Sequence, residues 1–270
     1  MNALCQMTGL SRAGFYRWRV PREATPVEME LRDQMQKVAV ESSAYGYRRI
    51  THELQRRGFD VNHKRVLRMM REDNLLCVRR RAFVVTTDSR HSLPVYPNLA
   101  CEMTPTAINQ LWVADITYIR LRTEFVYLAV VLDAFSRRVV GWALGRTLEA
   151  ELAAAALRMA LAERRPSPGL VHHSDRGVQY ASFAYTELLK QHHTAISMSR
   201  KGNPYDNAAC ESFMKTLKQE EVYRNEYRDF QGARASIGEF LERVYNQQRL
   251  HSALGYVPPA EFEENGGEGQ

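Results

Sequence analysis

The spacing of apolar residues near the start of the chain predicts a small all-helical domain. Apolar residues recur every three or four positions in 27–40 and again in 45–57, as they do along one face of a helix. Gly58 is placed to stop the second helix, and Asn62 can cap a third over 63–73. Two short helices joined by a tight turn predict a helix-turn-helix unit.

From Leu111 onward the helical spacing gives way to continuous apolar runs, which are typical of strands buried on both faces. The expected strands are 111–119, 125–133, 138–144, 170–173 and 194–198, and the expected helices are 149–165 and 183–192. Three antiparallel strands followed by helix, strand, helix and strand is the order of a ribonuclease-H-like mixed α/β sheet flanked by helices. In such a sheet the first and fourth strands lie side by side.

These patterns divide the chain into five parts. Residues 1–26 are expected to form an N-terminal helical fragment, and 27–81 a small all-α helix-turn-helix domain. The Pro-containing stretch 82–109 is expected to be a linker. Residues 110–220 form the predicted α/β core, and 221–270 a C-terminal helical extension and tail.

Composition favours a globular protein of the cytoplasm. The longest wholly apolar run, Phe125–Leu132, is too short to cross a bilayer, and the first residues show no signal-peptide pattern. The four cysteines are scattered, without CxxC pairs or zinc-ligand spacing, so they are expected to be reduced thiols. We therefore expect a cytoplasmic protein with no membrane partner.

The net charge of +6 is unevenly distributed along the chain. Residues 1–100 carry 18 Lys and Arg against 10 Asp and Glu, whereas 101–270 carry 19 against 21. A basic front half indicates nucleic-acid binding, although a solvated basic surface would have the same composition. The expected DNA contacts in this half are Lys64, Arg65, Arg68, Arg71, Arg79, Arg80 and Arg81.

Three carboxylates stand where an α/β core does not need them. Asp115 lies within the first predicted strand, Asp175 follows the fourth, and Glu211 lies on a helical run after 35 intervening residues. Two carboxylates about 4 Å apart repel by roughly 4 kcal/mol at an effective dielectric of 20, so a cluster of three requires a cation. Oxygen ligands suit Mg²⁺ or Mn²⁺, and two such ions about 4 Å apart can clamp a phosphoryl transfer.

The helix around Glu211 also carries basic residues. At about 100° per residue, Asn207, Lys215 and Lys218 lie within roughly 40° of Glu211. Lysines beside a metal-binding acid suit DNA phosphates, whereas the helix alone is equally compatible with surface Glu–Lys ion pairs. Further expected phosphate contacts are Arg176, Lys201, Arg249 and His251.

Two other aspartates are expected to serve the backbone. Asp133 is predicted to cap the turn that follows the second strand, and Asp206 the start of the Glu211 helix.

Three long motifs carry a family resemblance. HSDRGVQYAS (173–182), SRKGNPYDNAACESFMKTLK (199–218) and YNQQRLHSALGYVPPAEF (245–262) resemble the OrfB-type transposases of insertion-sequence family three. The three carboxylates resemble the DDE triad of retroviral integrases and bacterial transposases, and the resemblance covers nearly the whole chain.

The resemblance implies a magnesium-dependent enzyme that cleaves and joins DNA strands, with Asp115, Asp175 and Glu211 as catalytic residues and metal ligands. Such an enzyme excises and circularises an insertion sequence and then integrates it. The resemblance further implies two Mg²⁺ ions that Mn²⁺ can replace. Its implied partners are transposon ends, target DNA, further copies of the chain and an upstream OrfA partner or fusion, whose regions are expected to be absent here.

The residues alone leave two other functions open. A structure-specific nuclease would share the fold but would not join a supplied 3′-hydroxyl to DNA. A DNA-binding repressor with a relic core would show no metal-dependent cleavage.

Overall fold

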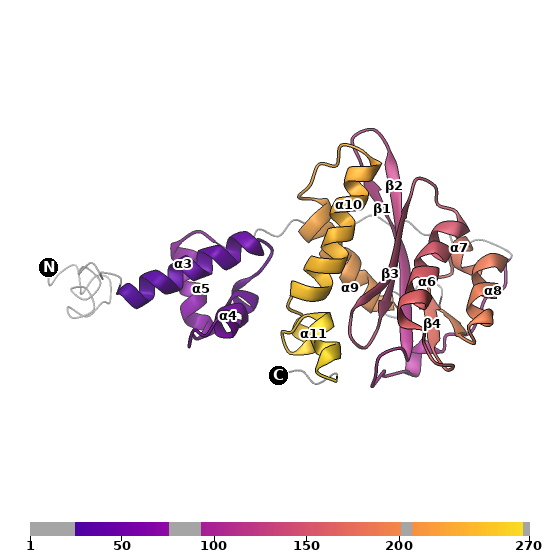
Figure 1. Ribbon diagram of the computed structural model, residues 1–270, viewed down its shortest axis with the longest axis horizontal. Helices are drawn as coiled ribbons and strands as arrows, with labels where there is room; N and C mark the ends of the chain where they lie inside the picture. The colour runs from indigo at the N-terminus through magenta and orange to yellow at the C-terminus, as the bar shows by residue number, and fades with distance from the viewer. Residues whose placement is uncertain (1–24, 76–92, 201–206, 267–270) are drawn as a thin grey trace, which may run out of the picture. The chain divides into compact units, whose positions relative to one another are not determined.

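The computed structural model describes residues 25–75, 93–200 and 207–266 (Figure 1). The chain divides into two compact units, 1–77 and 78–270. The expected N-terminal helix and the arginines at 79–81 lie outside the described residues. No helix in the described ranges is long and apolar enough to cross a membrane.

The first unit contains the three predicted helices, α3 (Pro26–Glu41), α4 (Tyr47–Arg56) and α5 (His63–Glu72). Asn62 caps α5 as expected, because its Oδ1 accepts a hydrogen bond from the Lys64 backbone N–H at 2.8 Å. Gly58 follows α4 with φ +87°, a conformation that glycine adopts without steric cost. The residues that form the buried centre are Leu31, Met35, Val38, Ile50, Leu54, Val66, Met69 and Met70.

The second unit is built on a five-stranded sheet of order β3-β2-β1-β4-β5. The strands are β1 (Leu111–Arg120), β2 (Phe125–Asp133), β3 (Val139–Gly145), β4 (Val171–Ser174) and β5 (Ala195–Met198). β1, β2 and β3 pair antiparallel, whereas β4 runs parallel to both β1 and β5. The expected ribonuclease-H-like mixed sheet, with the first strand beside the fourth, is confirmed.

Helices cover both faces of this sheet (Figure 1). One face packs on α6 (Ala150–Arg164), α7 (Val178–Ala181) and α8 (Phe183–Gln191). Gly141 of β3 permits the close approach of α6, because a Cβ there would lie 2.2 Å from the Ala156 carbonyl oxygen.

The opposite face is covered by the C-terminal part of the chain, from residue 208 onward. It packs on α9 (Ala208–Leu217), α10 (Phe230–Glu239) and the π-helical η4 (Phe240–Gln248). Another π-helical turn, η3 (Lys218–Val222), continues α9, and the short helices η5 (Ser252–Leu254) and α11 (Pro259–Glu264) follow.

The described part of the expected linker belongs to the second unit and packs on its sheet. It includes the short helix η1 (Ala100–Glu102). The backbone N–H of Leu99 donates to Ser197 Oγ at 2.8 Å, and the N–H of Met198 donates to the Pro97 carbonyl at 3.3 Å. Residues 97–99 therefore lie along the β5 edge of the sheet.

Candidate functional site

The pairing of β1 with β4 sets two aspartates at the same level of the sheet. Trp112 pairs with His172 and Val113 with His173 in parallel register. Asp115 and Asp175 each lie two residues beyond the last of these pairs. The parallel register therefore aligns their positions at neighbouring strands, as the sequence predicts.

Backbone N–H groups orient both carboxylates. Asp115 Oδ1 accepts from the N–H of Ile116 at 2.8 Å, and Asp175 Oδ1 accepts from the N–H of Gly177 at 2.9 Å. A Cβ at Gly177 would lie 2.9 Å from that same Asp175 oxygen, closer than real contacts allow. Glycine at 177 therefore lets the loop after β4 fold around the carboxylate.

A buried polar layer supports the loop after β4. His173 contacts Ser197 Oγ through Nδ1 at 2.8 Å and Ser199 Oγ through Nε2 at 2.9 Å. Arg176 donates from Nε to the Ser199 carbonyl oxygen at 2.8 Å. These bonds join the loop that carries Asp175 to the chain leaving β5. His173 thus links the end of β4 to the chain around β5.

Helix α9 brings the third carboxylate to this region. Its apolar side packs into the core, whereas Glu211 and Lys215 are exposed. At its start, Asn207 Nδ2 donates to the carbonyl oxygen of Ala114 at 3.2 Å, next to Asp115 in β1. Just beyond its end, the half-buried Lys218 places Nζ 5.0 Å from the centroid of the Tyr118 ring, also in β1.

Electrostatics show that the acidic groups share one environment. Burial raises the pKa of Asp115 to about 7, and repulsion from Asp175 and Glu211 adds to this effect. The Ile116 N–H and the Lys218 ammonium oppose the increase. Burial lowers the pKa of Lys218, and attraction to Asp115 partly offsets that change. Near neutral pH, Asp115 is therefore only partly charged.

The donor set of this region matches a hard divalent cation. Carboxylate oxygens are the ligands that Mg²⁺ and Mn²⁺ prefer, and a cation would relieve the repulsion that raises the Asp115 pKa. Within the described ranges, however, no three His, Cys, Asp or Glu side chains already form a group that could hold a metal ion.

Two buried polar atoms near the aspartates lack hydrogen-bond partners among the described residues. One is the hydroxyl of Tyr180, on the short helix after the Asp175 loop, and the other is Oδ1 of Asn207. The Tyr180 ring lies 3.6 Å from the place where a Gly177 Cβ would stand. Buried polar groups are normally satisfied, so these two atoms require an explanation.

In the first unit, α5 displays the predicted basic stripe. Lys64, Arg68 and Arg71 are exposed, and Arg65 is half-buried. Arg68 Nε lies 3.6 Å from a Glu72 oxygen, an exposed pair of little energetic weight. The remaining expected contacts, Arg79–Arg81 and Lys201, lie outside the described residues, as does the expected cap Asp206.

Two expectations about single residues have different outcomes. Asp133 caps the turn after β2, because its Oδ1 accepts from the N–H groups of Phe135 and Ser136 at 2.9 and 3.1 Å. Arg249, expected at a phosphate, is only 5% exposed and forms a two-pronged ion pair with Glu220 at 2.8 and 2.9 Å. His251 is likewise buried. Both side chains of the YNQQRLHSALGY segment that were expected at phosphate are therefore packed into the second unit.

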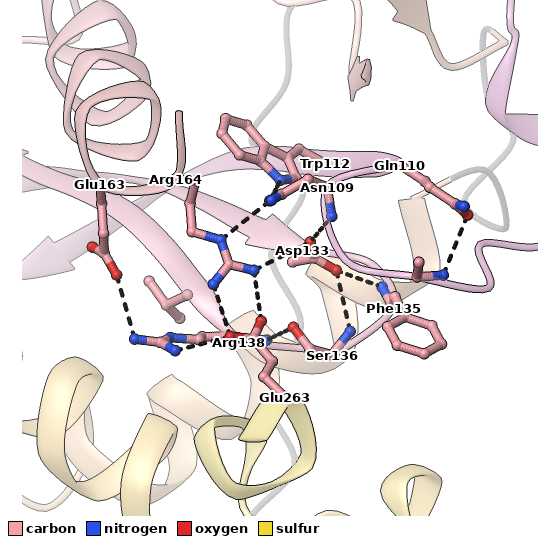
Figure 2. A network of polar contacts seen from close by, with 12 residues as sticks. Asn109, Gln110, Trp112, Asp133, Phe135, Ser136, Arg138, Glu163, Arg164 and Glu263 are labelled. Carbon is pink, nitrogen blue, oxygen red and sulfur yellow. Dashed lines mark hydrogen bonds and ion pairs between the residues drawn. The ribbon is translucent and has the colours of Figure 1, made fainter. Parts of the chain in front are cut away.

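Sequence reasoning missed the ion-pair network in Figure 2. Glu263 of α11 binds Arg164 of α6 through two bonds of 2.7 Å and Arg138 through one of 2.8 Å. Arg164 Nε also donates to Asn109 Oδ1 at 3.1 Å, and the Asn109 N–H donates to Asp133 at 2.7 Å. The network fastens the C-terminal helix to the ends of β2 and α6; no spacing rule in the sequence signals it.

Models of known families match both parts of the chain. An HTH-like domain matches residues 26–83, and two models of an integrase core domain match residues 105–204 and 192–259. Domains of both kinds act on DNA, and integrase core domains generally use a divalent metal ion.

Whole-chain relatives and a solved structure agree with these matches. The chain is 41% identical over 268 residues to an insertion element IS600 uncharacterized 31 kDa protein of Shigella sonnei, covering 97% of both chains. It is 35% identical over 269 residues to transposase InsF for insertion sequence IS3A of Escherichia coli, covering 97% of this chain and 93% of the relative. A chain of a simian T-cell lymphotropic virus intasome shares the fold, with TM-score 0.50, 15% identity and coverage of 84% of this chain and 73% of that one. The chain therefore belongs to the IS3 family of transposases, DNA-cleaving and strand-transferring enzymes with an integrase core domain.

Proposed function

We propose that Asp115, Asp175 and Glu211 are the catalytic carboxylates of this transposase and that they bind two Mg²⁺ ions, which Mn²⁺ can replace. The observation that carries the proposal is the parallel register of β1 and β4, which aligns Asp115 with Asp175. The pKa of Asp115, raised to about 7 by burial and by its acidic neighbours, supports it, because such a carboxylate gains most from a bound cation.

Glu211 completes the site from the helix. The described side chains do not yet form a group of three ligands, and Glu211 is exposed on the first turn of α9. Because its charge already acts on Asp115, a change of side-chain rotamer, assisted by a small shift of α9, is the movement that we infer on metal binding.

Each of the chain's own groups then has a distinct task. Asp115 and Asp175 hold the ions at the end of the paired strands, and Lys215 and Lys218 bind DNA phosphates along α9. Arg176 makes a further phosphate contact beside the site, and Lys201, which lies outside the described residues, is expected to make another. When bound, the two ions supply Lewis-acid activation of the attacking oxygen and stabilise the leaving oxygen in an in-line displacement. The chain cuts DNA to release a 3′-hydroxyl, which then attacks a second phosphodiester.

The helix-turn-helix unit binds DNA at a surface of its own, distinct from the carboxylates that act on the reacting strand. The exposed residues Lys64, Arg68 and Arg71 lie on α5 and suit phosphate contacts, with Arg65 at the edge of the same surface. We infer that α5 enters a DNA groove and that Arg79–Arg81 extend the contact.

Joining transposon ends to each other and then to a target requires that two DNA ends be held together. We therefore infer that copies of this chain assemble on DNA and that an OrfA-type partner or fusion contributes to recognition of the ends. Sedimentation of the chain with and without DNA that carries the transposon ends tests this inference. We expect a larger species only when the ends are present.

The proposal predicts that Asp115→Asn, Asp175→Asn and Glu211→Gln each reduce strand transfer by about 1000-fold, equivalent to about 4 kcal/mol of barrier. DNA affinity should change little. The assay supplies an oligonucleotide with a free 3′-hydroxyl, target DNA and Mg²⁺, and it measures joined products.

Matched controls are Asp229→Asn and Glu239→Gln. Asp229 accepts from the Gly232 N–H at 2.8 Å to cap α10, and Glu239 forms an exposed pair with Arg243. Both controls should retain activity. Undiminished joining by any one triad variant would remove that residue from the site, and cleavage without joining by the wild type would identify a nuclease instead.

A further inference from the structure

Asn207 occupies a position where its side chain would ordinarily serve its own helix. It is the N-cap residue of α9, and asparagine at this position usually accepts a hydrogen bond from a backbone N–H of the first turn. The Asn207 side chain makes no such bond. It turns instead toward β1, where Nδ2 donates to the Ala114 carbonyl at 3.2 Å.

This arrangement links two proposed metal ligands. Ala114 directly precedes Asp115, and Asn207 lies four residues before Glu211, one turn earlier on the same helical face. One amide group therefore spans the strand that carries Asp115 and the helix that carries Glu211. The other end of the same amide, Oδ1, is buried and has no hydrogen-bond partner among the described residues. Asn207 as a whole is only 9% exposed.

We propose that Asn207 is a positioning residue of the metal site, whose Oδ1 accepts a hydrogen bond from the hydration shell of a divalent cation held by the carboxylates. The inference rests on the proposed function. In this proposal, Nδ2 donates to the Ala114 carbonyl and holds α9 against β1, whereas Oδ1 accepts from water bound to the ion. Water bound to a cation is a strong donor, and hydrogen bonds of this kind orient ligands and raise metal affinity.

Asn246 provides a matched comparison within the same unit. It is also a buried asparagine, 7% exposed, that joins a helix to a strand through side-chain-to-backbone bonds. Its Nδ2 donates to the Val139 carbonyl at 2.9 Å, and its Oδ1 accepts from the Val139 N–H at 2.9 Å. Asn246 thus satisfies both halves of its amide, whereas Asn207 satisfies only one.

The test measures Mn²⁺ binding to the full chain without DNA, by the loss of the electron paramagnetic resonance signal of free Mn²⁺. Asn207→Ala should weaken Mn²⁺ binding by about 10-fold, within the range found when groups around metal ligands are removed. Asn207→Asp keeps an acceptor oxygen and should retain affinity within about 3-fold of the wild type or better it. Asn246→Ala should leave Mn²⁺ affinity unchanged even where it lowers the melting temperature.

The outcomes separate this inference from the proposed function. If the wild type binds no Mn²⁺, the metal site itself fails. If the wild type binds Mn²⁺ and Asn207→Ala binds it equally well, only the role of Asn207 is overturned. Equal losses in Asn207→Ala and Asn246→Ala, or a full loss in Asn207→Asp, would also overturn it. Should Asn207→Ala not fold, the Asn207→Asp measurement still decides.

Discussion

Asp115 has an environment that raises the free energy of its charged form. It lies in the middle of β1 opposite Val130, with Asp175 in the loop just after the neighbouring strand β4 and Glu211 within electrostatic reach. The Ile116 N–H and the Lys218 ammonium compensate only in part, because the pKa of Asp115 still rises to about 7. A carboxylate placed this way costs stability in the metal-free protein, and perturbed groups of this kind are concentrated at functional sites.

The raised pKa predicts a specific dependence of stability on pH. Between about pH 4 and pH 7 the folded state binds more protons at Asp115 than the unfolded state does, so the free energy of unfolding falls as pH rises through this window. Saturating Ca²⁺, a non-reacting probe, should raise the melting temperature more at pH 8 than at pH 6, where protons compete with it. Calorimetry of the full chain measures both effects.

Asp115→Asn is the control for this prediction. It removes the titrating group, so the variant should lose the Ca²⁺-induced difference between the two pH values. Equal Ca²⁺ shifts at pH 6 and pH 8 in the wild type would contradict the assignment of Asp115 as a competing ligand.

The sequence predicts the strands and the local caps, but it does not predict the long-range ion pairs between elements. β2 has the predicted bounds, Phe125–Asp133, because a continuous apolar run is typical of a strand buried on both faces, and all of β2 beyond Tyr127 is buried. The Asn62 cap and the Asp133 turn were predictable because these bonds link residues two or three apart in the sequence. Long-range pairs carry no such local signal, as Glu263 with Arg164 shows.

Arg249 is a second case in which the sequence does not reveal a long-range ion pair. In the sequence it is one basic residue in a motif, and a phosphate contact is a reasonable expectation. Its burial against Glu220, which lies in the π-helical turn after α9, depends on how the C-terminal half folds back on the sheet. For the proposed site, the sequence indicates the three candidate carboxylates, but only the structure reveals the bond from Asn207 to β1.

Helix α5 allows a prediction about DNA affinity. Lys64→Ala and Arg71→Ala should each weaken binding about equally for all sequences and reduce the slope of log affinity against log salt by about 0.9, the loss of one phosphate contact. Fluorescence anisotropy over a salt series measures the slope. Lys37→Ala on α3, where Lys37 pairs with Asp33 at 2.7 Å, is the control and should leave the slope unchanged. An unchanged slope in both α5 variants would exclude α5 as the DNA-binding surface.

For the whole molecule, most of the basic excess along the sequence falls in the first of the two units. The basic excess lies in residues 1–100, which include the HTH-like domain, and the acidic residues of the proposed site lie in the near-neutral remainder. Binding and chemistry therefore have different physical requirements in the two units. The proposed DNA contacts in the first unit need exposed cations on a helix, whereas the proposed site in the second unit needs partly buried aspartates held by a sheet.

We propose that Asp115 and Asp175 are metal ligands in a strand-transfer site. The most direct measurement compares strand transfer by Asp115→Cys and Asp175→Cys in Mg²⁺ and in Mn²⁺. A thiolate is a poor ligand for Mg²⁺ and a better one for Mn²⁺, so each variant should be inactive with Mg²⁺ and regain measurable joining with Mn²⁺. Joining at the wild-type rate in Mg²⁺ by either cysteine variant would contradict the account.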